Sequence, residues 1–446
     1  MDNAEIFVGL DIGTTSIKVI VAEKSNGEMN VIGAGTQPSR GLSRGVIVDI
    51  DQAASAIRAA VNQAEQKANV HIDSVILGIP ANQLKIEPAS GMVAVADGNQ
   101  AREITDRDVQ NVTNAALLQS LPPEREIISI AADEFVVDGF DEIQDPRGMV
   151  GVRLEMHGTL YSGPKTIVHN AKKAVMQAGL HVADVTVTPL ALGRTVLNDG
   201  EQDFGTVVID LGGGQTTAAV IHDHQLKYAT VDQEGGDFIT KDISVVLNTS
   251  MSDAERLKRD FGFANADQAN EENQFPVTVV GQPEPVSVSE HYLAEIIEAR
   301  VQQIFDTLRA SLDQVGALSL PGGIVLTGGV AALPGIVELA EDIFGVRARI
   351  YVPEQMGLRH PQNATALALI KYSGLQNETQ RLVKDALMGE FVPQADVTPV
   401  IDEQTARRQV AQATPTNDQT SQTTVSSKDK KNRVSGLRDF FRNFFD

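Results

Sequence analysis

The amino-acid sequence predicts an α/β protein with more than one domain. From Glu5 to about Tyr372, short apolar runs alternate with segments of helical periodicity. Only 4% of residues are aromatic and none is Trp, so we expect a core of Val, Ile, Leu and Ala. With 446 residues, the chain exceeds the roughly 250 to 300 residues that a single core reaches.

The elements follow in order along the chain. Short apolar runs bounded by turn residues predict strands, and apolar residues at helical spacing predict helices. The predicted strands are 6–12, 16–23, 27–35, 73–80, 181–189, 204–212, 215–221 and 225–231, and the predicted helices are 50–68, 164–179 and 289–312. This order favours mixed sheets covered by helices. Between Pro80 and His169 an insertion carries its own strand, helix and strand patterns, which predicts a small extra subdomain.

Charge and composition exclude several classes of protein. The net charge of −22 argues against general nucleic-acid binding, because phosphate backbones would be repelled. No cysteine is present, so disulfides and thiolate metal sites are excluded and the cytosol is the expected compartment. We expect neither a signal peptide nor a transmembrane helix. Segment 392–432 is rich in Gln, Thr, Ser and Asp, which predicts a disordered linker.

Two glycine loops repeat each other in the two halves of the chain. VGLDIGTTSIKVIVA places Asp11 and Gly13 between two apolar strands, and VVIDLGGGQTTAAVI places Asp210 and Gly212 likewise, each 199 residues later. One D-x-G sequence alone is compatible with an ordinary β-turn, but the matched pair predicts phosphate loops whose N–H groups face an anion. The candidate ligands are Gly13, Thr14, Thr15, Lys18, Gly212, Gly213, Gly214, Gln215 and Thr216.

The two carboxylates predict a cation. A carboxylate beside a phosphate is repulsive unless a cation lies between them, so Asp11 and Asp210 indicate Mg²⁺, held partly through water. We assign these two residues a cation-organising role in any catalysis. Further candidates for nucleotide contacts are Gly235, Gly236, Glu255, Lys258, Gly328 and Gly329. Taken alone, Gly328 and Gly329 are also compatible with a common strand-to-helix turn, and the Glu255 and Lys258 pair with a solvated helix face.

The ordered set of motifs resembles the actin-like ATPase superfamily. GLDIGTTSIKVIVA and TVVIDLGGGQTTAAVI resemble its phosphate motifs, GGIVLTGGVAALPGI its adenosine motif, and VTVTPLALGRTVL and RHPQNATALALIKY its two connecting helices. The resemblance implies two domains hinged over a cleft that binds ATP and Mg²⁺. The stretch VTPLALGR has Thr188 where many relatives have a Glu or Gln that orients water. A threonine hydroxyl is a poor base, so we expect slow hydrolysis.

The C-terminal segment 433–446 has the pattern of an amphipathic helix. Its apolar side chains fall within an arc of about 140° at 100° per residue. We predict that the helix forms against a membrane, with its basic residues near anionic head groups. Docking on the protein's own body is the alternative. The candidate membrane-binding residues are Leu437, Phe440, Phe441, Phe444, Phe445, Arg438 and Arg442.

An actin-like chain with this insertion, linker and terminal helix resembles the bacterial cell-division family FtsA. The resemblance implies an ATP-binding protein that polymerises at the inner face of the cytoplasmic membrane at the septum. It also implies that the protein tethers FtsZ there through the FtsZ C-terminal peptide and recruits later division proteins. Arg300 is the candidate FtsZ contact, with a solvated helix charge as the alternative. The implied parts are domain 1 (1–82, 166–195), the inserted subdomain (83–165), domain 2 (196–231, 311–391), an FtsZ-binding subdomain (232–310), the linker and the terminal helix.

Two other functions remain compatible with these motifs. An ATPase of a pilus or secretion platform would recruit its membrane partner through protein contacts. A sugar kinase of the same fold would need a catalytic Asp in a carbohydrate pocket, and it would leave the terminal helix without a purpose. Liposome binding with and without residues 434–446 distinguishes these alternatives.

Overall fold

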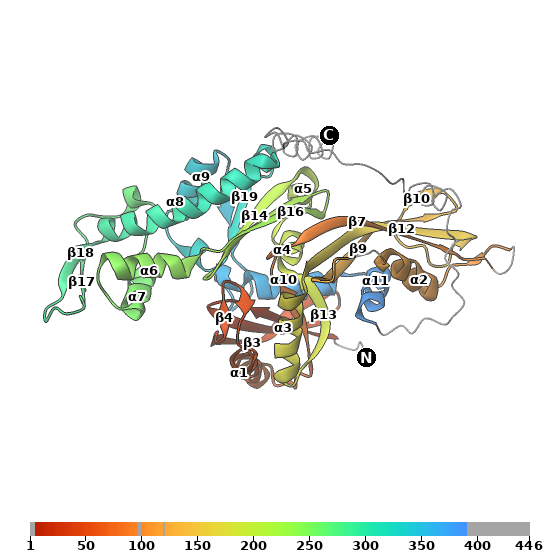
Figure 1. Ribbon diagram of the computed structural model, residues 1–446, viewed down its shortest axis with the longest axis horizontal. Coiled ribbons are helices and arrows are strands. Elements are labelled where there is room, and N and C mark those ends of the chain that lie inside the picture. Colours follow the sequence, from red (N-terminus) through yellow and green to blue (C-terminus); the bar gives the residue numbers. More distant parts are fainter. Residues whose placement is uncertain (1–4, 97–99, 119–120, 390–446) are drawn as a thin grey trace, which may run out of the picture. The chain divides into compact units, whose positions relative to one another are not determined.

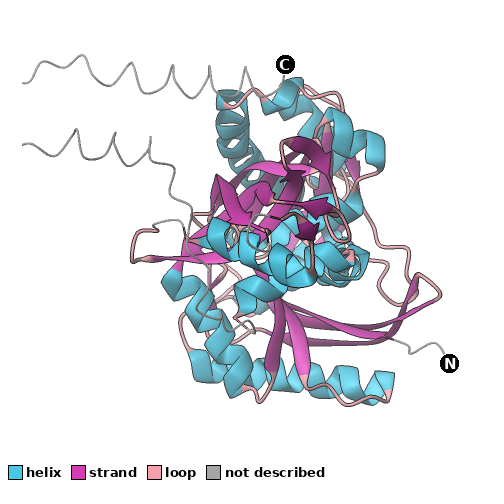
Figure 2. Cartoon of the chain, turned by 90° about the vertical axis from the view of Figure 1, so that its right-hand side faces the viewer, coloured by secondary structure: helices cyan, strands magenta, loops and turns pink. Residues whose placement is uncertain are grey.

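The computed structural model describes residues 5–96, 100–118 and 121–389. Contacts between residues divide the chain into two compact units. Of the described residues, unit 1 comprises 5–86, Leu121–Ser129 and Tyr161–Gln376, and unit 2 comprises those within 87–118, Ile130–Leu160 and 377–389. The predicted linker 392–432 and the predicted terminal helix 433–446 lie outside the described residues. Figure 2 shows helices and strands interspersed through the described chain.

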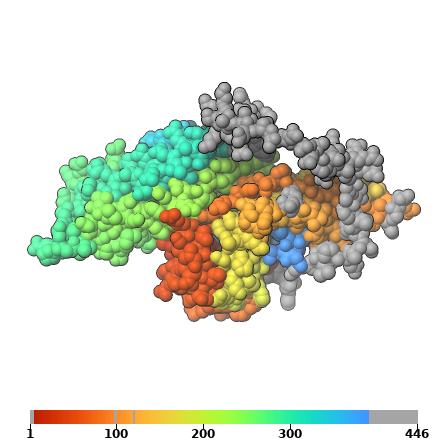
Figure 3. All heavy atoms as spheres, in the orientation of Figure 1, coloured from red at the N-terminus to blue at the C-terminus, as the bar shows by residue number. Residues whose placement is uncertain are grey.

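The first sheet of unit 1 has the strand order β13-β6-β1-β2-β3. Its strands are β1 (Glu5–Ile12), β2 (Ser16–Ser25), β3 (Glu28–Pro38), β6 (Ser74–Ile79) and β13 (His181–Val187). Helices α1 (Ile50–Ala68) and α3 (Lys165–Gln177) pack against each other and against this sheet, and Figure 3 shows them side by side in red and yellow. The Asp49 side chain caps α1 by accepting a hydrogen bond from Gln52 N–H.

The second sheet repeats the plan of the first, with the order β16-β15-β14-β19-β20. Its strands are β14 (Thr206–Leu211), β15 (Thr216–His222), β16 (Gln225–Asp232), β19 (Ile324–Thr327) and β20 (Ala348–Ile350). The register also repeats, because Asp11 lies opposite Lys18 and Asp210 opposite Thr217. The structure therefore confirms the two related mixed-sheet halves that the duplicated loops predict (Figure 1).

Two helices join the halves of unit 1. Helix α4 (Thr188–Val196) follows β13 and leads through α5 (Asp199–Phe204) into the second sheet, and α10 (Ala364–Leu375) packs on α4 and β1. A Cβ atom at Gly9 would lie 2.6 Å from the Ala366 carbonyl oxygen, so this close approach requires glycine. Shorter elements complete this region: β4 (Leu42–Ser43), β5 (Val46–Ile47), η2 (Ala317–Ser319), η3 (Val330–Ala332), α9 (Ile336–Phe344) and η4 (Pro361–Asn363).

A subdomain follows β16 within unit 1 and appears in green in Figure 3. Its elements are α6 (Gly236–Val246), α7 (Met251–Phe261), η1 (Ala266–Gln268), β17 (Gln274–Val277), β18 (Val286–Ser289) and α8 (Glu290–Gln314). Helix α8 buries Leu293, Ile297, Val301 and Phe305 at helical spacing and contacts α6, α7 and α9. The long helix that the sequence predicts over 289–312 is confirmed as α8.

Unit 2 is built on the strands of the insertion. The strands β7 (Lys85–Ala94), β9 (Arg125–Val137), β10 (Phe140–Ile143) and β12 (Arg153–Pro164) form a sheet ordered β10-β9-β12-β7, and β8 (Arg102–Glu103) pairs with β11 (Val150–Gly151). Helix α2 (Asp106–Leu117) buries Val109 and Val112. The nearly fully buried Asp108 accepts two hydrogen bonds of 2.7 Å from Arg102. This pairing compensates the burial of its charge.

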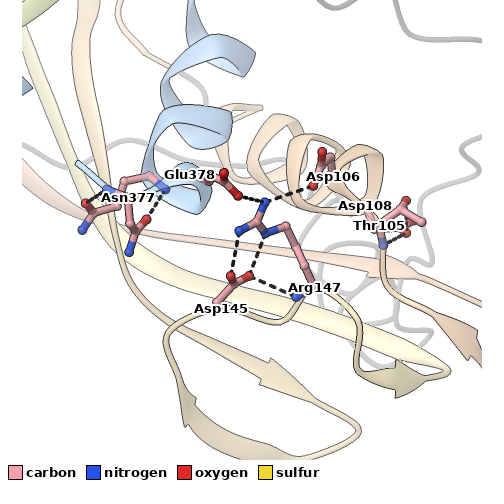
Figure 4. A network of polar contacts seen from close by, with 8 residues as sticks. Thr105, Asp106, Asp108, Asp145, Arg147, Asn377 and Glu378 are labelled. Carbon is pink, nitrogen blue, oxygen red and sulfur yellow. Dashed lines mark hydrogen bonds and ion pairs between the residues drawn. The ribbon is translucent and has the colours of Figure 1, made fainter. Parts of the chain in front are cut away.

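Helix α11 (Glu378–Met388) belongs to unit 2 and packs on α2. Figure 4 shows how Arg147 connects the two helices. Its guanidinium bonds Asp145 at 2.8 Å and Glu378 at 2.9 Å, and it lies 3.4 Å from Asp106. Hydrogen bonds from Arg147 are the largest influence on Asp145 and lower its pKa to about 2. One arginine thus links the start of α2, the start of α11 and the turn before β11.

Candidate nucleotide-binding site

The first phosphate loop is held by its own strand pair. Asp11 lies one residue before the end of β1, opposite Lys18 on β2, and the Lys18 Nζ atom lies 3.3 Å from Asp11 Oδ2. Ser39 ties the loop to the chain beyond β3, since its hydroxyl donates to the Gly13 carbonyl at 2.5 Å and its N–H to the Thr15 carbonyl at 3.0 Å. Lys18 is 8% exposed, so the ion pair is largely shielded from water.

The second loop is held by the start of α6. Gly236 N–H donates to the Gly212 carbonyl at 3.0 Å, and Asp237 N–H donates to the Gly213 carbonyl at 2.8 Å. A Cβ atom at Gly235 would lie 2.5 Å from the Gly212 oxygen, so only glycine allows this approach. Thr216 is also anchored here, through a 2.9 Å bond from its hydroxyl to the Glu234 carbonyl.

The two loops face each other across the two halves of unit 1. A Cβ atom at Gly213 would lie 1.7 Å from Thr15 Oγ1, and one at Gly214 would lie 2.4 Å from Thr14 Cγ2. Side chains at either glycine would keep the loops apart. The arrangement brings the two glycine loops to one place, as a site for a chain of phosphates requires.

Asp210 carries a charge that the protein alone compensates poorly. Burial and the nearby charge of Asp11 raise the pKa of Asp210 to about 6, against the opposing effects of Lys18 and a hydrogen bond from Thr365. That bond measures 3.3 Å from Thr365 Oγ1 to Asp210 Oδ2. A buried carboxyl group whose ionisation is opposed by a neighbouring carboxylate fits a site completed by a cation.

The chain does not build a cation cage by itself in its described part. Among residues 5–96, 100–118 and 121–389, no three His, Asp or Glu side chains cluster in a way that could hold a metal ion. A Mg²⁺ ion would therefore take its ligands from Asp11, Asp210, phosphate oxygens and water. This fits the preference of Mg²⁺ for keeping several waters and few protein carboxylates.

The residues predicted to contact the nucleoside also converge. Lys258 Nζ donates to the Gly236 carbonyl at 2.9 Å and pairs with Glu255 at 2.6 Å. A Cβ atom at Gly236 would touch Val330, which follows Gly329. Gly328 has a φ of 92°, a conformation that favours glycine. Lys258 is buried and Glu255 is partly buried, so this pair does not lie on a fully solvated helix face, which was the alternative interpretation.

Several residues at the site were not predicted from the sequence. Asp237 accepts a 3.5 Å hydrogen bond from Thr15, and burial, its main influence, raises its pKa. Thr365 contacts Asp210, and Thr240 contacts both Lys258 and Glu255. The glycine pair before Asp237 gave a local signal for this position. Nothing in the spacing identified Thr365, because it lies 155 residues from its partner.

The partner-binding and membrane-binding predictions concern other residues. Arg300 is bonded to Asp242 at 2.5 Å and to Glu234 at 2.6 Å, and its guanidinium lies 5.7 Å from the Phe238 ring centre. Its side chain is 18% exposed, so it is not a freely solvated charge. The membrane-binding candidates lie outside the described residues. Within the described ranges, no helix combines the length and apolar character needed to cross a membrane.

Comparison with solved structures defines the class of the fold. The type IV pilus biogenesis complex PilM–PilN matches with a TM-score of 0.57 at 18% identity, covering 83% of this chain and 99% of that one. MreB5 of Spiroplasma citri bound to ADP matches with a TM-score of 0.52 at 14% identity, covering 82% and 95%. Together with the duplicated sheets and facing loops, these matches establish an actin-like ATPase fold.

Sequence comparison identifies the family within that class. The family model described as "Cell division protein FtsA" matches residues 207–368. The model described as "SHS2 domain inserted in FTSA" matches residues 81–162. FtsA of Enterococcus faecalis is 51% identical over the full length of both chains, and FtsA of Enterococcus hirae is 56% identical over 88% of each. FtsA of Escherichia coli is 31% identical over 82% of this chain and 90% of its own. The chain belongs to the FtsA family of bacterial cell-division proteins.

Proposed function

We propose that this chain binds ATP with Mg²⁺ between the two halves of unit 1. The observation that carries the proposal is the pair of facing loops with Asp11 and Asp210 at their bases. The fold neighbour MreB5 of Spiroplasma citri, described as bound to ADP in one structure and to AMPPNP in another, supports nucleotide binding by a chain of this fold. In the proposed complex, the loop N–H groups and Lys18 hold phosphate oxygens, and the two carboxylates hold the hydrated cation.

We further propose that the protein polymerises on the inner face of the cytoplasmic membrane at the division septum. There it would link the FtsZ ring to the membrane and recruit later division proteins. Family membership supports a division role, and the fold neighbour MamK, described as a double helical filament, supports assembly by this class of fold. The apolar and basic pattern of segment 433–446 supports contact with anionic lipid.

The subdomain from α6 to α8 is the proposed docking site of the FtsZ C-terminal peptide. Arg300 is already bonded to Asp242 and Glu234. A contact with an acidic group of the peptide would therefore exchange one of these partners. We expect Arg300→Ala to weaken binding of an FtsZ C-terminal peptide in a polarisation titration. Unchanged affinity would exclude Arg300 from the contact.

Nucleotide titration of two variants tests the cleft. Asp210→Ala removes a cation-organising carboxylate, and Gly329→Arg fills the approach to the nucleoside. No atom lies within 4 Å of a Cβ built at Gly329, so the first carbon of the new side chain meets no internal clash. Both variants should lose ATP affinity in the presence of Mg²⁺, whereas Gln282→Ala, on an exposed loop, should bind like the parent. If both variants fold and bind ATP with the affinity of the parent, the proposed binding of ATP between the two halves is refuted.

A further inference from the structure

Two amide side chains lie at the edge where the phosphate loops meet. Asn82 follows β6 and is 7% exposed, and Gln215 ends the second loop. Strands β1 and β6 run parallel with Gly9 opposite Ile76. The residues after β6 therefore lie beyond the same edge of the sheet as Asp11, and Gln215 reaches this region from the other half of unit 1.

The turn between β4 and β5 joins these amides to the first loop. Gly45 N–H donates to Thr14 Oγ1 at 2.8 Å, and Asn82 Nδ2 donates to the Arg44 carbonyl at 3.5 Å. A Cβ atom at Gly45 would lie between 2.2 and 2.8 Å from the amide atoms of Gln215. The two amides thus flank a two-residue turn that is itself bonded to the phosphate loop.

The oxygen atoms of both amides lack a partner. Within the described part of the chain, Asn82 Oδ1 and Gln215 Oε1 are buried and accept no hydrogen bond. A buried carbonyl oxygen without a donor is unfavourable, and such groups are normally satisfied by ordered water or a ligand. A phosphate oxygen cannot donate to them in its ionised form. A water molecule can donate one hydrogen atom to each.

We propose that Asn82 and Gln215 are positioning residues for the water that attacks the terminal phosphate. This inference rests on the proposed binding of ATP between the loops. Each amide oxygen accepts one hydrogen atom of the water, which directs an oxygen lone pair toward the terminal phosphorus. The water oxygen bonds to phosphorus as the bond to the bridging oxygen breaks. The electron pair leaves with the diphosphate, and the protons pass to phosphate and solvent.

The chemistry of the amides also sets a limit on the rate. An amide oxygen orients a water molecule but does not take up its proton at neutral pH, so it supplies no general base. Thr188 does not supply one either. The Thr188 methyl carbon would lie 2.8 Å from a Cβ atom built at Gly78, so the methyl group of Thr188 packs against strand β6. Orientation without a base is consistent with slow turnover.

Variants that remove each acceptor test the proposal in the full chain with ATP and Mg²⁺. Asn82→Ala removes one acceptor, and Gln215→Met removes the other while preserving length. Each should lower kcat by roughly tenfold or more, with the affinity for ATP changed less than about twofold. The double variant should lose little more than the more damaged single variant, because both amides hold one water. Gln282→Ala is the control for a lost surface amide.

The possible outcomes separate this inference from the proposed function. Folded variants whose kcat stays within twofold of the parent, or whose ATP affinity falls in parallel with kcat, overturn the positioning role. If circular dichroism shows that Gln215→Met does not fold, the kcat and ATP affinity of Asn82→Ala alone decide whether the positioning role holds. A parent that binds ATP without hydrolysing it overturns the inference and leaves nucleotide binding intact. A parent that does not bind ATP refutes both.

Discussion

Asp210 occupies a position where ionisation is costly before any ligand arrives. It is surrounded by protein on most sides, retains partial exposure at the cleft and lies near the charge of Asp11. A carboxyl whose pKa rises on folding binds protons more tightly in the folded state. Its contribution to stability therefore declines as pH rises from its ordinary pKa near 4 to about 6.

We predict that Asp210→Asn stabilises the ligand-free protein at pH 7. The shift to about 6 corresponds to roughly 3 kcal/mol at most, and solvent screening at the cleft reduces this to about 1 to 2 kcal/mol. The difference in the free energy of unfolding should shrink as pH falls below 6 and disappear near pH 4. Urea unfolding without nucleotide or Mg²⁺ measures it at both pH values. A variant that is less stable than the parent at pH 7 would contradict this account.

Residues near one another in sequence were predicted more completely than residues brought together by folding. The two loops were found because glycine, hydroxyl and acidic residues recur at the same spacing in both halves. Asn82 had no local signal, and Asp237 had only the glycine pair before it. Neither was predicted as a site residue, because each meets the loops only through the packing of strands and turns far apart in the chain. Thr15 and Asp237, for example, are separated by 222 residues.

At the scale of elements, periodicity identified helices and strands but not the surfaces that they cover. The predicted helix 50–68 matches α1, and the eight predicted strands that entered the two sheets lie within about three residues of their predicted bounds. No bounds were predicted for β19 and β20, which complete the second sheet. The sequence interpretation placed 311–391 in the core of domain 2. In the structure, α10 packs on the first sheet and α11 packs on α2 in unit 2. Helical spacing states which face is apolar, and it carries no information about the partner of that face.

Helix α11 provides a prediction at this scale. Arg147→Met should loosen α11 from α2, which hydrogen exchange of the α11 amides would measure as lower protection. The partners of Arg147 are substantially exposed, so we expect about 1 kcal/mol rather than global unfolding. High salt should reduce the difference by screening. Arg153→Met, which removes another exposed ion pair of unit 2, should leave α11 protection unchanged.

The pH dependence of this contact has a defined direction. Because Arg147 lowers the pKa of Asp145, the ion pair stabilises the folded state fully above the ordinary value of about 4. This stabilisation is lost as pH falls toward 2. The protection of α11 should therefore be insensitive to pH between 5 and 8. A marked loss of protection within that range would show that another titrating group holds the helix.

At the scale of the whole molecule, we predict slow ATP turnover. Thr188 stands where a carboxylate or amide is expected, and the amides at the cleft orient water without acting as a base. The steady-state rate at saturating ATP and Mg²⁺ should lie well below the enzyme median of about 10 s⁻¹. Phosphate release measured with the purified full-length chain tests this. A rate at or above that median would reject it.

We also predict that membrane binding depends on assembly. Burial of Leu437 and four phenylalanines gives roughly 7 to 15 kcal/mol gross, and ordering of the chain offsets much of it. One tail should thus bind reversibly, and many tails on a polymer should bind with high avidity. Phe441→Glu with Phe444→Glu should abolish liposome co-sedimentation and preserve nucleotide binding. If a monomeric variant with the native tail sediments as completely as the parent, avidity is not required.

The membership of α11 in unit 2 has a mechanical consequence. Residues 390–446 are joined covalently to α11, and α11 is fastened to the inserted subdomain by its packing on α2 and by Arg147. Any pulling force on the C-terminal segment therefore acts first on α11 and on its packing contact with α2. A second path is the covalent connection of two residues, Gln376 and Asn377, between α11 and α10 of unit 1. The contact between α11 and α2 therefore shares the load with that connection and limits how much traction reaches the nucleotide-binding halves.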